Sequence, residues 1–245
     1  MPFGLAHDTT HAALIGSAPR ASLKALAAGL CLIPLTGLAD RPLVSETADV
    51  IGRDACQVEA AAGHGRTSGA PKVREWSGVI TCGAAFDTQP ALAYASSRVA
   101  GEKEEVLLLG AKTTLQMPGH SRPGYGIAYS VGGVKLPGAS WRREEFNVTG
   151  LFTAEIAPNL LGHANLGWNR SRSLRQDTTV WSLGVETVGD FTVAADFFGD
   201  DRGRPSVSAG AGWVLGKGLS VNAAYATRFE SPRVNQLSAG AKLVF

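Results

Sequence analysis

The sequence predicts an all-β protein, a transmembrane antiparallel up-and-down β-barrel of about 12 strands. Three observations predict this fold. Thirty glycines are spread through 245 residues, which disfavours a helical bundle because glycine is a poor helix former. Apolar and polar residues alternate with period two in segment after segment, as in strands that present one face to an apolar surrounding. Short connections alternate with longer, charged ones.

The charge composition excludes two classes of protein. Charged residues make up 18% of the chain and hydrophobic residues 44%, a balance unlike that of an intrinsically disordered protein. The 23 basic and 21 acidic residues leave a net charge of +2, too small for binding driven by a basic surface. We therefore expect no nucleic-acid partner.

Residues 1–39 form an N-terminal extension and a predicted secretory signal peptide. Arg20 and Lys24 precede an apolar run over 25–39 that ends with the small residues Gly37 and Ala39. The run is shorter than the roughly 20 apolar residues of a membrane-spanning helix. Cleavage after Ala39 would leave residues 40–245 as one barrel domain. The alternative for the apolar run is a buried core helix.

Two cysteines, Cys56 and Cys82, remain in the chain after that cleavage. A secreted protein meets an oxidising compartment, so an even pair predicts a disulfide. If the first loop lies near 63–75, the two residues come opposite each other on the first two strands. The alternative is two unpaired, buried thiols.

The predicted strands have one apolar face and one face of small polar residues. Over 219–229, for example, Leu219, Val221 and Tyr225 alternate with Ser220 and Asn222. Small polar residues suit the inside of a closed barrel whose apolar face meets lipid, whereas a soluble sandwich would carry Lys and Glu on its polar face. We expect strands near 54–62, 76–86, 90–99, 104–117, 124–135, 144–157, 160–170, 178–188, 190–199, 205–215, 218–229 and 235–245.

The connections predict the orientation of the barrel. Outer-membrane barrels have short periplasmic turns and longer outer loops, and an even number of strands puts both chain ends in the periplasm. We expect short turns at 87–90, 157–159, 188–190 and 216–218, with 118–123 long for this set. We expect longer loops at 63–75, 101–104, 136–143, 170–177, 199–205 and 230–233.

Aromatic residues fall at two heights in this topology, as in the girdles at the two lipid–water boundaries. The set at the outer ends of strands is Trp76, Trp168, Trp181, Phe197 and Phe229, and the set at the periplasmic ends is Phe86, Phe191 and Phe245. Phe245 closes an alternating strand and resembles the C-terminal signature recognised by the barrel-assembly machinery. Outer-membrane lipid and that machinery are therefore the expected partners.

The start of the predicted mature chain resembles a known family. Arg41-Pro-Leu-Val44 and Gln57-Val-Glu59 match the opening and first strand of transporter-like barrels of the MetA-pathway of phenol degradation family. Residues 45–47, Ser-Glu-Thr, depart from the Thr and acidic pair of that pattern. The resemblance spans about 20 residues and implies the outer membrane of a Gram-negative bacterium, a transport role and no catalytic residues to transfer.

Inward-facing ionisable residues are the candidates for function, because charges in a barrel lumen can stay hydrated. They either line a narrow pore and tune its selectivity, or pair with one another in a network that has only a structural role. By strand parity the lumen candidates are Lys112, Glu155, His163, Glu186, Asp196, Arg228 and Lys242.

An enzymatic function would depend on a possible Ser-His-Glu set formed by Ser182, His163 and Glu186. No sequence motif fixes the geometry of these three residues. The mature chain has three scattered histidines without metal-ligand spacing, and we expect no cofactor. We therefore expect a non-enzymatic, transporter-like or narrow-pore protein, with a small-molecule solute as a further partner. The alternatives are a structural or interaction barrel with a plugged lumen and a barrel lipid-modifying enzyme.

Overall fold

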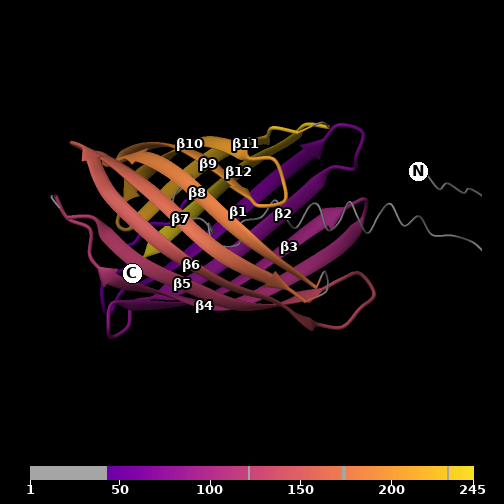
Figure 1. The fold of residues 1–245 in the computed structure, drawn as a ribbon, viewed down its shortest axis with the longest axis horizontal. Helices are drawn as coiled ribbons and strands as arrows, with labels where there is room; N and C mark the ends of the chain where they lie inside the picture. The colour runs from indigo at the N-terminus through magenta and orange to yellow at the C-terminus, as the bar shows by residue number, and fades with distance from the viewer. Residues whose placement is uncertain (1–42, 121, 173–174, 231) are drawn as a thin grey trace, which may run out of the picture. The chain divides into compact units, whose positions relative to one another are not determined.

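The computed structural model describes residues 43–120, 122–172, 175–230 and 232–245 (Figure 1). The signal peptide and its cleavage site, predicted over 1–39, lie outside these residues. The described chain forms a closed, antiparallel barrel of twelve strands, which confirms the predicted fold class. The strands are β1 (Cys56–Thr67), β2 (Val73–Cys82), β3 (Thr88–Val99), β4 (Glu102–Gln116), β5 (Gly124–Lys135), β6 (Arg142–Ala157), β7 (Leu160–Ser171), β8 (Gln176–Thr187), β9 (Phe191–Asp200), β10 (Ser206–Gly216), β11 (Leu219–Arg228) and β12 (Val234–Val244).

The barrel closes because β1 pairs with both of its neighbours in the ring. Gln57 stands opposite Val244 of β12 and opposite Thr81 of β2. Closure leaves no strand edge unpaired, which a sheet in a membrane requires. None of the described residues belongs to a helix with the length and apolar character needed to cross a membrane.

The predicted disulfide is present and joins the first residue of β1 to the last residue of β2. Cys56 is the register partner of Cys82, their Cα atoms are 4.1 Å apart, and their sulfur atoms are bonded. The bridge therefore ties the first hairpin at the end of the barrel that carries the C-terminus.

Several predicted loops are shorter than expected. Residues 63–67 and 73–75 belong to β1 and β2, which leaves 68–72 as the connection, and residues 102–104 begin β4 after a connection of only 100–101. Charged residues there suggested loops, but a strand that continues beyond the lipid can carry charge on either face. The connection 117–123 lies at the chain-end side, so loop length separates the two ends of the barrel less clearly than predicted.

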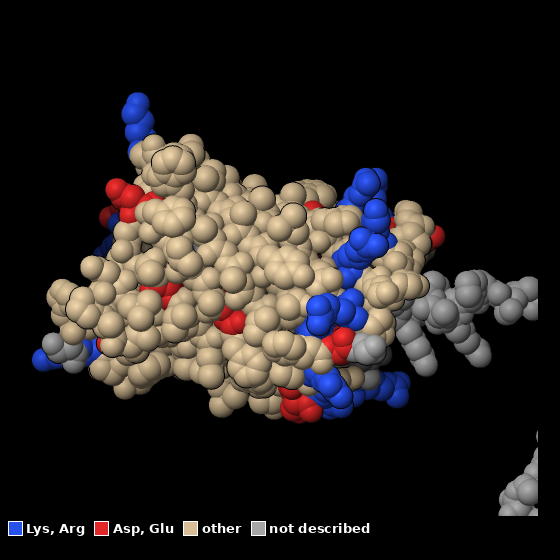
Figure 2. Space-filling view, turned by 90° about the horizontal axis from the view of Figure 1, so that it is seen from above, with Lys and Arg blue, Asp and Glu red and all other residues tan. Residues whose placement is uncertain are grey.

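The outer wall of the barrel is apolar between its ends. In β11, Val221 and Tyr225 are 36% and 49% exposed, whereas Asn222 between them is partly buried. This confirms the predicted parity. Figure 2 shows one face of the surface, where Lys and Arg gather towards the ends and the band between them is largely uncharged. An apolar band of this kind matches a hydrocarbon environment.

Aromatic rings on the outside lie towards both ends of the strands. Trp168 and Phe197 are each 40% exposed at the end opposite the C-terminus, and the ring of Phe197 lies 5.0 Å from that of Trp181. Phe245 is 65% exposed at the other end. Phe86 is exposed too, but it belongs to the connection after β2, because that strand ends at Cys82 rather than at the predicted residue 86.

Candidate functional site

The lumen holds part of the chain itself. Residues 43–51, here called the inner segment, make hydrogen bonds to side chains of the barrel wall and cross from one side of the ring to the other. At one side, Asp196 of β9 accepts hydrogen bonds from the backbone N–H groups of Val44 and Ser45, at 2.8 and 3.0 Å. At the other, Gln89 of β3 accepts one from the N–H of Ile51 at 2.9 Å. Strands β3 and β9 are six apart in the ring of twelve, so the inner segment bridges opposite walls.

The middle of the inner segment is held through its backbone at Ala48. The N–H of Ala48 donates to Thr153 Oγ1 of β6 at 2.9 Å, and its carbonyl accepts from Thr114 Oγ1 of β4 at 2.6 Å. Its methyl group packs with Ala128 and Leu151 in a small apolar cluster. Peptide groups buried without partners destabilise a protein, so these wall hydroxyls are what allow an extended segment to lie in the lumen.

Lys112 of β4 contacts the inner segment directly. Its Nζ lies 3.4 Å from Glu46 Oε1 and donates to the carbonyl of Thr47 at 3.3 Å. Burial raises the pKa of Glu46, and the Lys112 ammonium opposes this shift. The pair places one charge of each sign inside the barrel, at the point where the inner segment crosses β4.

A glycine leaves room for the inner segment beside β9. A Cβ atom on Gly184 would lie 2.6 Å from Asp196 Oδ1 and 2.7 Å from Ser45 Oγ. Both distances are far below van der Waals contact, so any side chain here would displace Ser45 or its anchor. Gly184 and Asp196 are register partners on β8 and β9.

The nominal Ser-His-Glu set is not assembled. His163 Nε2 lies 3.2 Å from Glu186 Oε1, and its Nδ1 lies 3.1 Å from Thr153 Oγ1. Ser182 instead donates to Asn165 Oδ1 at 3.0 Å. His163 and Glu186 therefore form a buried pair beside the wall residue that holds Ala48, and the serine belongs to a different contact.

Two other predicted lumen residues form ion pairs with residues outside the inner segment. Glu155 pairs with His120 at 2.6 Å, and Arg228 pairs with Glu230 at 3.4 Å. Lys242 is partly buried on β12. The structure thus brings Lys112, Asp196, His163 and Glu186 to the contacts around the inner segment, directly or through Thr153, and pairs Glu155 and Arg228 elsewhere. A pore-lining role for all seven stays a prediction. In the described part of the chain, no group of three or more His, Cys, Asp or Glu could hold a metal ion.

Sequence reasoning missed the neutral wall anchors and one acid. The inner segment is contacted by Asn165, Thr153, Thr114 and Gln89. Their sequence does not distinguish them from other neutral polar residues on the lumen face. Glu59 is 2% exposed and faces the lumen next to Gln57. Its period-two spacing from Gln57 could have identified it as a lumen residue.

Solved structures with the same fold include outer-membrane channels and porins. No protein-family model matches the chain, and no curated protein matches it by sequence. The COG4313 outer membrane channel from Pseudomonas putida F1 aligns with a TM-score of 0.59 and 8% identity, over 81% of this chain and 98% of that one. The KdgM porin in complex with disordered oligogalacturonate aligns with a TM-score of 0.57 and 8% identity, over 76% and 99%. The NanC porin aligns with a TM-score of 0.56 and 7% identity, over 76% and 98%.

At these identities the likeness concerns the fold alone, and the resemblance to the phenol-degradation family stays a prediction. The fold and the apolar outer band agree with each other, because only a closed barrel lets strands cross hydrocarbon with every backbone group paired. The chain has the fold of outer-membrane β-barrels, with an apolar outer wall and a polar lumen that holds its own inner segment.

Proposed function

We propose that this protein is a narrow channel for small solutes in the outer membrane, with the inner segment as its constriction. The observation that carries the proposal is the crossing of the lumen from Asp196 to Gln89, which divides the space available to a solute. The channels and porins that share the fold support transport rather than catalysis.

The constriction is held by contacts that can be exchanged for water. The described anchors are hydrogen bonds from wall side chains and one ion pair, and each such contact contributes about 0.5–1.5 kcal/mol net, more where a charge takes part. No disulfide joins the described inner segment to the wall, since the one in the described chain links β1 and β2. The segment can therefore shift while the barrel stays closed.

Conductance in planar bilayers tests this function. The folded full chain should give discrete current steps, and the variant Asp196→Ala should give larger ones, because two backbone N–H groups lose their acceptor. A matched control is Asp177→Ala, an exposed acid on β8 that pairs with Arg170 away from the inner segment. Heat-modifiable mobility on a gel checks folding of every variant. Folded protein without current steps, in both the wild type and Asp196→Ala, would contradict the proposal and favour a structural barrel.

A further inference from the structure

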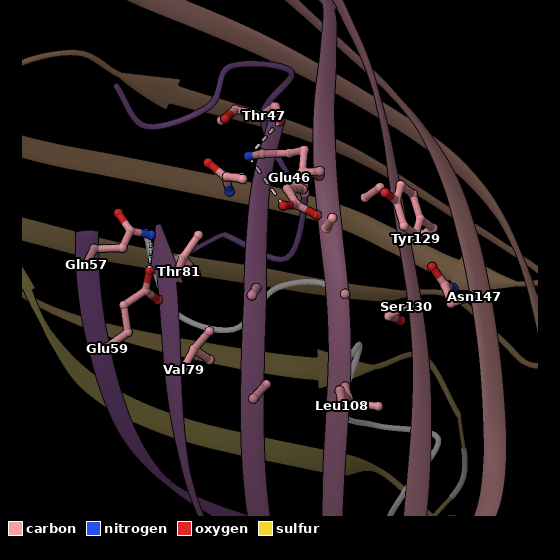
Figure 3. Close-up of a pocket in the computed structure, with 18 of the residues that line it drawn as sticks. Glu46, Thr47, Gln57, Glu59, Val79, Thr81, Leu108, Tyr129, Ser130 and Asn147 are labelled. Carbon is pink, nitrogen blue, oxygen red and sulfur yellow. Dashed lines mark hydrogen bonds and ion pairs between the residues drawn. The ribbon is translucent and has the colours of Figure 1, made fainter. Parts of the chain in front are cut away.

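A cavity of about 140 Å³ lies between the inner segment and the wall formed by β1 to β6 (Figure 3). It is several times the volume that one water molecule occupies, and comparable to cavities that hold a small organic molecule. Its lining combines carboxylate, amide and hydroxyl groups with the apolar side chains Leu43, Val79 and Leu108. A guest there would meet polar groups at one side and hydrocarbon at the other.

Two residues of the cavity lining each carry a buried polar atom that has no hydrogen-bond partner within the described chain. Glu59 is 2% exposed; its Oε1 accepts a hydrogen bond from Gln57 Nε2 at 2.6 Å, while its Oε2 has none. Ser45 is 4% exposed, and its Oγ also has none. Figure 3 shows Gln57 and Glu59 side by side on β1. A carboxylate buried in this way is destabilised unless a positive group or a proton donor reaches it.

The charges around the cavity do not balance. Its charged lining residues are Glu46, Glu59 and Lys112, so in their ionised forms they leave one negative charge in excess. Lys112 contacts Glu46 and the carbonyl of Thr47. Glu59 interacts electrostatically with both Glu46 and Lys112. Lys242 of β12 is the register partner of Glu59 but lies outside the cavity lining, so a guest in the cavity would meet one more carboxylate than ammonium groups.

We propose that this cavity binds a small primary ammonium ion, with its charged end at Glu59 and its alkyl part against the apolar lining. The N–H donors of an ammonium match the carboxylate of Glu59, whose Oε2 has no hydrogen bond within the described chain. The inference rests on the proposed function and extends it. Small organic amines are the solutes that the channel favours.

Binding is measured on the folded full chain in detergent, independently of conduction. The probe is methylammonium, whose methyl protons report contact through saturation-transfer difference NMR; methanol and acetate serve as neutral and anionic comparisons. We expect a saturable signal from methylammonium alone. Glu59→Gln keeps the shape of the side chain and removes its charge, and should weaken binding by about tenfold.

Two further variants separate this site from a general effect of lumen charge. Glu75→Gln changes a partly buried carboxylate on the same face of β2 as Thr81 and Val79, outside the cavity lining, and should leave binding unchanged. Lys112→Gln removes the repelling ammonium and should strengthen binding severalfold. A purely structural role for Glu59 does not predict opposite effects at Glu59 and Lys112.

The outcomes distinguish the inference from the proposed function. Equal signals from methylammonium and methanol, or equal loss in Glu59→Gln and Glu75→Gln, would overturn the ammonium site even if the barrel conducts. Full displacement of methylammonium by an equal concentration of potassium would also overturn it, as the site would then accept any monovalent cation. If methylammonium binds but no current steps appear in bilayers, the ammonium site is supported and the channel function is contradicted.

Discussion

Asn165 and Glu46 exchange two hydrogen bonds inside the barrel. Asn165 Oδ1 accepts from the N–H of Glu46 at 2.7 Å, and Asn165 Nδ2 donates to the carbonyl of Glu46 at 2.9 Å. The side-chain amide thereby offers the same donor and acceptor that a neighbouring strand would offer. One residue of β7 thus satisfies both backbone groups of an extended residue that lies in no sheet.

Asn165→Ala should loosen the inner segment. Both backbone groups of Glu46 lose their partner, and each group left buried without one costs about 1–3 kcal/mol. We expect a larger single-channel conductance and faster cleavage near residue 46 by an added protease. Asn169→Ala is the matched control, since Asn169 lies on the same face of β7 and makes no hydrogen bond to the described inner segment. Equal behaviour of the two variants would show that Asn165 is not an anchor.

The buried pair of His163 and Glu186 should behave as a unit in unfolding. The His163 side chain is 0% exposed, so removing the carboxylate beside its Nε2 by Glu186→Ala should cost about 1–3 kcal/mol. The double variant with His163→Ala should cost less than the sum of the two single variants, because neither member of the pair is then left without the other. Urea unfolding from lipid vesicles measures all three. Additive losses would exclude coupling between the two side chains.

The two faces of β11 should tolerate charge very differently. Ala223→Arg points into lipid and should cost about 2–4 kcal/mol near the bilayer midplane, with a smaller loss for Val221→Arg nearer the strand end. Asn222→Arg points into the lumen, where the new charge stays hydrated, and should alter conductance while leaving folding intact. The folded fraction in vesicles compares the three variants. Selective loss with Asn222→Arg would contradict the observed parity.

The predicted orientation of the barrel can be tested by labelling on intact cells. Ala139→Cys lies in the connection 136–141 and should react with a membrane-impermeant maleimide, because that end is predicted to face outwards. His120→Cys lies in the connection 117–123 at the end near the C-terminus and should react only after the outer membrane is opened. The reverse pattern would place both chain ends outside.

The strands were predictable because their signal is local and repeated. The expected segment 124–135 coincides with β5, and the other strands differ from expectation by a few residues at their ends. The largest difference is in β1, which continues to Thr67 instead of ending near residue 62. The hydrocarbon boundary sets where the alternation stops being apolar, but pairing sets where the strand ends, and the two differ when strands project beyond the lipid.

The lumen was only partly predictable, for a reason of range. Parity showed that Lys112 and Asp196 point inwards, but not what they contact, since Asp196 meets Ser45 across 151 positions of the chain. Residues 43–51 show neither apolar–polar alternation nor a run of charges, so their sequence does not predict an interior location. Their place depends on Thr114, Thr153, Asn165 and Gln89, each of which looks like an ordinary lumen residue on its own.

The route of the inner segment has a consequence for assembly. Its two end anchors, Asp196 and Gln89, belong to strands that face each other only when the sheet has curled into a ring. In an open sheet the same strands are separated by the five strands between them, too far for one short segment to reach both. Docking of residues 43–51 therefore adds its free energy to the closed form alone. The segment acts as a cross-brace that favours sealing of the seam between β1 and β12.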